Sequence, residues 1–284
     1  MMNAANPIDN TPTAVWNGAA GEAWVDAQAL MDGMFAPIEA LLVETVSADP
    51  ARNVLDVGCG TGGTTLAMAR AIGAQGRCTG IDISEPMIAA ARARADTEAV
   101  PADFICADAQ THPFEPGRFD RVVSRFGVMF FDDFTRAFAN LRRAATDDAR
   151  MRLIAWRSPE ENPFMTAAER AAAPLLPDLP PRNPDEPGQF AFADRDRPHR
   201  FLKEAGWTGI DITPIDFRCT FPEPALERYL ARLGPVGRVL AGTDEATRAK
   251  VVAAVRPAFD PYVAESEVRF TAACWMIDAR APAA

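Results

Sequence analysis

Histidine and tyrosine are scarce in this chain, which has two of each among its 284 residues. His112 and His199 are therefore the only candidates for an imidazole base, and we expect a loop residue and a surface residue, respectively. Neither Tyr229 nor Tyr262 is followed four residues later by lysine, so the Tyr-x-x-x-Lys pair of many hydride-transfer enzymes is absent. The sequence indicates no general base, and the catalytic residue stays unknown.

Cysteine and long apolar runs are also sparse. The five cysteines are odd in number and form no C-x-x-C pair, which argues against a disulfide framework and a zinc knuckle. No histidine–carboxylate cluster has the spacing of metal ligands, so we expect no metal. No run of about 18 apolar residues could span a membrane, and the stretch MMNAANPIDNTPTAVW does not resemble a signal peptide. We therefore expect a cytoplasmic protein.

Positive charge is in the minority, with 29 basic against 39 acidic residues and a net charge of −10. Such a surface repels nucleic acid and anionic membranes, so we expect neither as a partner. A small molecule is the expected partner, and the oligomeric state is left open, a homodimer included. Hydrophobic residues make up 48% of the chain, which is enough for a buried core.

Apolar runs and helical patterns alternate along most of the chain. Apolar residues repeat at helical spacing in several segments, which predicts helices over about 36–46, 62–72, 84–91, 132–145 and 196–205. Seven strand-like segments accompany them, at 53–57, 77–82, 102–106, 119–124, 151–156, 210–221 and 268–278. This order predicts an α/β fold with a doubly wound, seven-stranded, mostly parallel sheet. Ligands of such sheets bind beyond the carboxyl ends of the strands.

The same pattern divides the chain into six parts. We expect an N-terminal helical flap at 1–35, with Trp16 and Trp24 over the ligand, and a ligand-binding core at 36–156. A lid insertion at 157–193 contains the proline-rich stretch 174–187, which excludes regular structure there. The core continues at 194–222, a second helical lid insertion follows at 223–265 with a helical stretch over 224–263, and the last strand and tail occupy 266–284.

A glycine cluster, Gly58-Cys59-Gly60-Thr61-Gly62-Gly63, follows the first strand and opens a helix. Read as G-x-G-x-x-G, and with Asp82 about twenty residues later, it satisfies the dinucleotide fingerprint. The loop alone therefore leaves an NAD-type oxidoreductase open.

Three carboxylates at successive strand ends favour S-adenosylmethionine (SAM) instead. Asp56 precedes the first glycine, where a carboxylate suits an ammonium group and repels a pyrophosphate. Asp82 ends the second strand and can accept hydrogen bonds from ribose hydroxyls. Asp108 follows the third strand and can accept from an adenine amino group.

These residues resemble class I SAM-dependent methyltransferases over about 50–157. Residues 54–62 are similar to the first motif of that family, 80–84 with Met87 to the ribose motif, 108–109 to the adenine motif, and 119–124 to the fourth-strand motif. The resemblance implies a Rossmann-like fold, SAM as cofactor and S-adenosylhomocysteine (SAH) as product. The implied cofactor-binding residues are Asp56, Gly58, Cys59, Gly60, Gly62, Asp82, Ile83, Met87, Asp108, Ala109, Ser124 and Arg125.

The similarity is greatest to the subgroup of small-molecule methyltransferases that includes the ubiquinone and menaquinone C-methyltransferases (methyltransferase type 11-like). The Arg-Asn signature of the quinone enzymes is replaced after Ser124 by RFGVMF, so the sequence does not indicate a quinone ring as acceptor. Aromatic residues near the strand ends predict an apolar or aromatic acceptor, methylated on O, N or C by in-line displacement. The candidate substrate-binding residues are Phe126, Phe130, Trp156 and Phe164. A SAM-binding protein without transferase activity remains an alternative.

Overall fold

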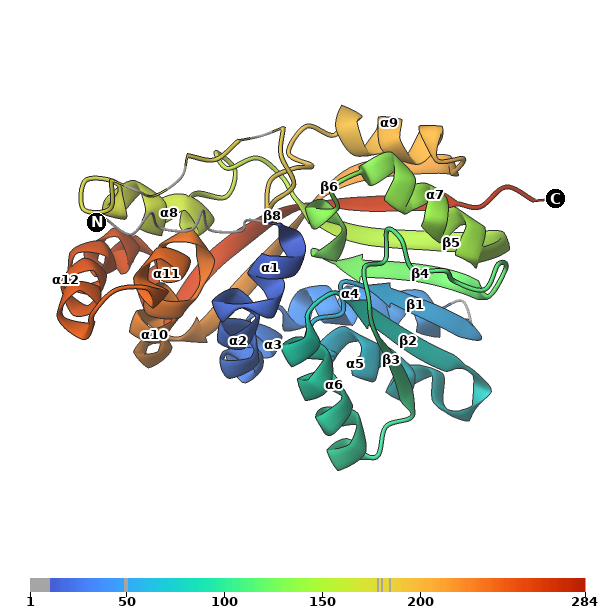
Figure 1. Cartoon of the computed structure of the whole chain (residues 1–284), viewed down its shortest axis with the longest axis horizontal. Helices are drawn as coiled ribbons and strands as arrows, with labels where there is room; N and C mark the ends of the chain where they lie inside the picture. The colour runs from blue at the N-terminus through green and yellow to red at the C-terminus, as the bar shows by residue number, and fades with distance from the viewer. Residues whose placement is uncertain (1–10, 49–50, 178, 180, 184, 284) are drawn as a thin grey trace, which may run out of the picture.

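The computed structural model describes residues 11–48, 51–177, 179, 181–183 and 185–283 (Figure 1). The first ten residues of the predicted flap, three positions of the proline-rich stretch and Ala284 lie outside the described residues. The sheet has the strand order β3-β2-β1-β4-β5-β8-β6, and a short strand, β7, pairs with β8. The strands are β1 (Asn53–Val57), β2 (Arg77–Asp82), β3 (Ala102–Cys106), β4 (Phe119–Arg125), β5 (Ala145–Trp156), β6 (Thr208–Pro222), β7 (Val263–Ala264) and β8 (Glu267–Arg280).

The predicted doubly wound α/β fold is confirmed. Strands β3, β2, β1, β4 and β5 are paired in parallel, whereas β8 is antiparallel to both of its long neighbours. The order reverses between β1 and β4, which is where sheets of this kind bind ligands. The covering helices are α4 (Ala36–Ser47), α5 (Gly63–Ile72), α6 (Glu85–Glu98), α7 (Phe134–Ala144) and α9 (Asp196–Glu204). Helix α4 packs with α5 and α7 with α9, on opposite sides of the sheet in Figure 1.

Helices from the two predicted lid insertions gather beyond one end of the paired strands β6 and β8 (Figure 1). This helical unit consists of α8 (Pro163–Ala172), α10 (Leu226–Arg232), α11 (Gly234–Ala241), α12 (Glu245–Val255) and η4 (Arg256–Tyr262). At its centre Phe164 stacks on Phe270 with ring centroids 3.9 Å apart. Three short helices, α1 (Pro12–Asn17), α2 (Ala19–Asp26) and α3 (Gln28–Met34), lie between this unit and the parallel sheet in Figure 1.

One predicted helical stretch is interrupted, and one predicted strand boundary is wrong. The helical stretch over 224–263 is divided into η3 (Glu223–Ala225), α10, α11, α12 and η4. Its breaks coincide with Gly234-Pro235 and with Asp244, whose side chain caps α12, because proline and capping residues start new helices. Strand β5 begins at Ala145 rather than at 151, since its polar first half lies at the solvent-exposed amino end.

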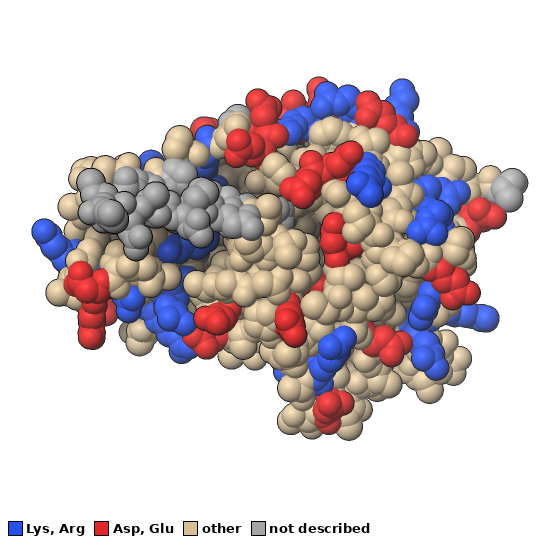
Figure 2. All heavy atoms as spheres, viewed as in Figure 1, with Lys and Arg blue, Asp and Glu red and all other residues tan. Residues whose placement is uncertain are grey.

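Acidic and basic side chains alternate over the face shown in Figure 2, so neither charge forms one broad patch there. The five cysteines are free thiols. Among the described residues, the helices are too short or too polar to cross a bilayer.

Candidate functional site

The glycine loop between β1 and α5 has a backbone that only glycine adopts readily. Gly58, Gly60 and Gly62 have φ values of +69°, +54° and +82°. A Cβ on Gly58 would lie 2.5 Å from the Cα of Gly127, so the loop packs backbone against backbone on the turn after β4. The carbonyl of Ile81 accepts hydrogen bonds from the amides of Gly58 and Cys59, which fixes the loop to the end of β2.

Asp82 lies where β2 ends and is held by the loop. Its Oδ2 accepts from the Gly60 amide at 2.8 Å and its Oδ1 from the Ser84 amide at 2.9 Å. Burial raises the pKa of Asp82, and the amide hydrogen bonds from Ser84 and Gly60 oppose that rise. A carboxylate has about four lone-pair sites, so each oxygen retains one for a ligand hydroxyl.

Asp56, near the end of β1, is buried against α5. It is 1% exposed and accepts a hydrogen bond of 2.6 Å from the Thr65 hydroxyl on α5. Burial raises the pKa of Asp56 to about 6, although the Thr65 hydrogen bond and the Arg125 charge lower it. The side chain thus supplies a buried negative charge beneath the loop rather than a surface group.

Asp108 closes the turn that follows β3. Its Oδ1 accepts from the Gln110 amide at 2.8 Å and its Oδ2 from the Thr111 hydroxyl at 3.2 Å. The neighbouring Ala109 is buried, and the Ala107 amide donates to the Asp82 carbonyl. The ends of β2 and β3 are therefore joined at one edge, as the strand-end pattern predicts.

Two other predicted cofactor residues border this loop. Met87, at the start of α6, is 4% exposed, and its sulfur lies 3.7 Å from the position that a Cβ on Gly60 would occupy. Ile83 belongs to the turn between β2 and α6, where Ser84 caps the helix by accepting from the Met87 amide. Met87 thus packs beside the glycine loop as the ribose-motif resemblance implies.

Ser124 and Arg125, at the end of β4, have different environments. The Ser124 hydroxyl is fully buried, donates to the Val57 carbonyl at 2.6 Å and accepts from the Gly127 amide at 3.1 Å. It therefore holds the turn after β4 against the glycine loop. Arg125 lies over the Phe35 ring and 3.8 Å from the Asp32 carboxylate, and its Nη1 is buried without a hydrogen-bond partner.

The four candidate substrate-binding aromatics do not form one group. Phe126, in the left-handed region with φ +66°, stacks on Trp156 at 4.5 Å, and both are buried. Phe130 is only half-buried and meets Trp16 edge-on at 5.3 Å. Phe164 lies apart from these three, in the core of the helical unit. The structure thus leaves Phe130 with the most accessible ring surface near the strand ends.

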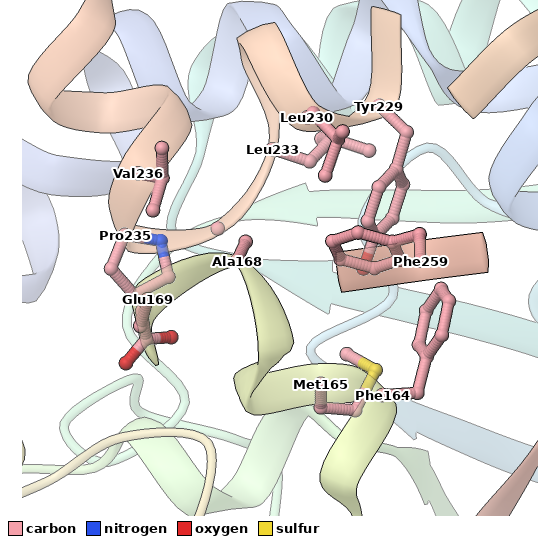
Figure 3. Close-up of a pocket in the computed structure, with 11 residues that line it drawn as sticks. Phe164, Met165, Ala168, Glu169, Tyr229, Leu230, Leu233, Pro235, Val236 and Phe259 are labelled. Carbon is pink, nitrogen blue, oxygen red and sulfur yellow. The ribbon is translucent and has the colours of Figure 1, made fainter. Parts of the chain in front are cut away.

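Phe164 is one of the residues that line a pocket in the helical unit (Figure 3). Tyr229 and Phe259 contribute further rings, and the Glu169 carboxylate points away from those rings toward its partner, Arg182. Burial raises the pKa of the Tyr229 hydroxyl. The pocket is apolar inside and shares no lining residue with the glycine loop.

The two histidines are placed as expected. His112 packs its ring against Phe114 in the loop after β3, with centroids 4.7 Å apart, and His199 is exposed on α9. Within the residues that the structure describes, no three histidine, cysteine or carboxylate side chains could together hold a metal ion.

The sequence analysis did not identify Asn17, at the end of α1. Its Nδ2 donates to the Ile83 carbonyl at 3.1 Å and its Oδ1 accepts from the Glu85 amide at 2.8 Å. The preceding carbonyl, of Trp16, accepts from the Ser84 hydroxyl at 2.6 Å. A single asparagine in a short N-terminal helix gives no sequence signal for a contact with a turn 66 residues away.

Comparisons with known proteins find relatives of the segment that carries this loop. Residues 54–148 match the family described as "Methyltransferase domain". The demethylmenaquinone methyltransferase of Thermus thermophilus is 33% identical over 114 residues, which cover 40% of this chain and 51% of that protein. The nocamycin O-methyltransferase of Saccharothrix syringae is 32% identical over 120 residues, 42% of this chain and 43% of its own. The chain thus spans about half the length of these curated relatives.

A solved structure extends the likeness in fold to almost the whole chain. The [4+2]-cyclase SpnF superposes with a TM-score of 0.59 at 18% identity, over 98% of both chains. At this identity the comparison concerns the fold alone. The doubly wound sheet with its additional helices is therefore shared beyond the matched segment.

Proposed function

We propose that this chain, whose residues 54–148 form a domain of the class I SAM-dependent methyltransferases, transfers a methyl group from SAM to a small-molecule acceptor. One observation carries the proposal. Asp82 accepts a hydrogen bond from the Gly60 amide, which places a carboxylate beside the glycine loop at the carboxyl end of β2. SAH would be the other product.

The strand ends fit the parts of SAM. Asp82 has acceptor positions left for ribose hydroxyls, and Asp108 lies at the next strand end for an adenine amino group. Asp56 adds a buried negative charge beneath the loop, which stabilises a cationic ligand above it. The backbone of the loop leaves room for close approach because its three glycines lack side chains.

SAM supplies an already activated methyl group, so the residues of the chain mainly have to place the acceptor and exclude water. Correct placement of reactants is worth about 7–11 kcal/mol in favourable cases. Trp16 and Phe130, in edge-on contact beside the β2–α6 turn, are the residues that we assign to this role. Their rings favour an apolar or aromatic acceptor. The acidic net charge supports a partner other than nucleic acid or membrane.

A SAM-binding protein that transfers no methyl group is the second candidate. The fold match to the [4+2]-cyclase SpnF supports this second candidate, because one fold hosts different chemistries. Formation of SAH that depends on an added acceptor would exclude this candidate.

Calorimetric titration with SAM, SAH and NADH tests the proposal. We expect SAM and SAH to bind and NADH not to bind, and Asp82→Ala to lose at least tenfold in SAM affinity, because buried charged hydrogen bonds are worth more than about 1.4 kcal/mol. Asp103→Ala, which removes an exposed carboxylate from β3, is the matched control and should bind as the wild type does. Binding of NADH without SAM would contradict the proposal and favour the oxidoreductase alternative.

A further inference from the structure

We propose that Asp26 is a positioning residue that couples occupancy of the cofactor site to the placement of helix α10 in the helical unit. The inference rests on the proposed function, because it takes the ends of β2 and β3 to be the cofactor site. The N-terminal helices α1 and α2 are the connecting element. They touch the cofactor side at one end and the helical unit at the other.

On the cofactor side, the end of α1 is fixed to the β2–α6 turn by the three hydrogen bonds of Trp16 and Asn17. The same turn holds Asp82 through the Ser84 amide. A ligand that binds Asp82 therefore contacts a residue that is held by this turn, and the turn is hydrogen-bonded directly to α1.

Helix α2 is packed onto this turn without an intervening side chain. A Cβ on Gly21 would lie 2.1 Å from the Trp16 carbonyl oxygen and 2.9 Å from the Ser84 hydroxyl. Only glycine fits there, so α1, α2 and the turn are in direct contact and a shift of the turn displaces α2.

At the other end of α2, Asp26 meets α10. The Asp26 carbonyl accepts from Arg228 Nη2 at 2.8 Å, and its carboxylate accepts from Arg232 Nη2. The two arginines are four residues apart and so share one face of α10. That face is turned toward α2, which also contacts α11.

The solvent exposure of the Asp26–Arg232 ion pair limits the size of the coupling. The side chains of Asp26 and Arg232 are 50% and 45% exposed, and half-exposed ion pairs are weak. We therefore expect cofactor binding to change the local opening of α10 by about fivefold at most. Because coupling is reciprocal, an acceptor that orders α10 would tighten cofactor binding by the same factor.

Hydrogen exchange of the α10 amides, with and without saturating SAH, tests the inference without knowledge of the acceptor. In the wild type we expect SAH to slow exchange over 226–232 by about twofold to fivefold. Asp26→Ala removes the contact to Arg232 but keeps the backbone contact to Arg228, so it should reduce this slowing while SAH still binds, and Asp26→Asn, which keeps an acceptor oxygen, should restore part of it. Glu22→Ala removes an equal charge from the exposed face of the same helix and should behave as the wild type does. In a double-variant cycle, Arg232→Ala should add nothing to Asp26→Ala.

The outcomes separate this inference from the proposed function. If SAH binds but leaves exchange of α10 unchanged, or slows it equally in Asp26→Ala, the coupling is refuted and the cofactor assignment stands. If SAH does not bind at all, both fail.

Discussion

The glycine loop and the helical unit are both well packed, but by different means. The loop is held by buried polar contacts, namely the hydroxyls of Thr65 and Ser124 and the carboxylates of Asp56 and Asp82. The helical unit is held by rings around Phe164. Apolar packing stabilises without directing charge, whereas a buried carboxylate reduces stability and creates an electric field. The difference fits the proposal that the loop binds a ligand, whereas the core of the helical unit stabilises the fold.

Substitution of Gly58 by alanine should have the largest effect. Backbone strain and the clash with Gly127 each cost up to about 3 kcal/mol, so we expect a loss near 5 kcal/mol in the free energy of unfolding, with no measurable SAM binding. Gly117→Ala is the control, because Gly117 also has positive φ but a Cβ there would contact nothing within 4 Å. Equal losses in the two variants, measured by urea denaturation, would show that close approach to Gly127 is unimportant.

In the helical unit, Phe164→Ala should cost about 4 kcal/mol of stability because it leaves a cavity among stacked rings. SAM affinity should change by no more than about fivefold, the limit of the coupling through Asp26, at a temperature where the variant is folded. Leu175→Ala, at a residue that is 40% exposed, is the control for a lost apolar side chain. A tenfold loss of SAM affinity in Phe164→Ala would mean that the two regions are not separable in this way.

Asp56→Asn should separate stability from binding. A carboxyl pKa raised from 3.8 to about 6 means that the folded state binds the proton more tightly than the unfolded state. The stability cost is therefore absent below pH 4 and complete above pH 6, at about 3 kcal/mol. We expect the variant to be more stable than the wild type at pH 7, and the difference to vanish toward pH 4, in denaturation at several pH values.

SAM affinity of the same variant should fall, because the buried charge that favours a cation is gone. A variant that is neither more stable nor weaker in binding would contradict the assignment of Asp56 as the buried charge of the site. Thr65→Val serves as a comparison, since it removes the hydrogen bond but not the carboxylate.

Ser124→Ala should lower the free energy of unfolding by less, about 2 kcal/mol, because the Val57 carbonyl and the Gly127 amide lose their hydrogen-bond partner. We expect SAM affinity to fall by several-fold, since Gly127 positions the loop. Thr97→Ala, which removes a solvent-exposed hydroxyl from α6, should change neither property by a measurable amount. Differential scanning calorimetry and SAM titration distinguish the two variants.

The cofactor side of this comparison was largely predictable from sequence, because its signals are local. Gly58, Gly60 and Gly62 stand at the strand end that their spacing predicts, and α6 begins after its cap, Ser84, where a helix was predicted to start. Local patterns also gave the other long strands to within a few residues, except for the polar start of β5.

What the sequence did not reveal depends on contacts between distant segments. Asn17 meets a turn 66 residues away and Asp26 meets Arg228 202 residues away, and neither residue type is unusual in a short helix. Phe164 was expected to bind substrate because it closely follows β5, but α8 turns its ring into the helical unit. Periodicity reports which residues are buried and not which partner covers them.

The most direct test of the central claim is a crystal structure of the protein with SAH. We predict that the ribose hydroxyls lie within hydrogen-bond distance of the Asp82 carboxylate, with the adenine at Asp108 and Ala109 and the sulfur facing Phe130. SAH bound elsewhere, for example in the pocket around Phe164, or bound without contact to Asp82, would contradict the account.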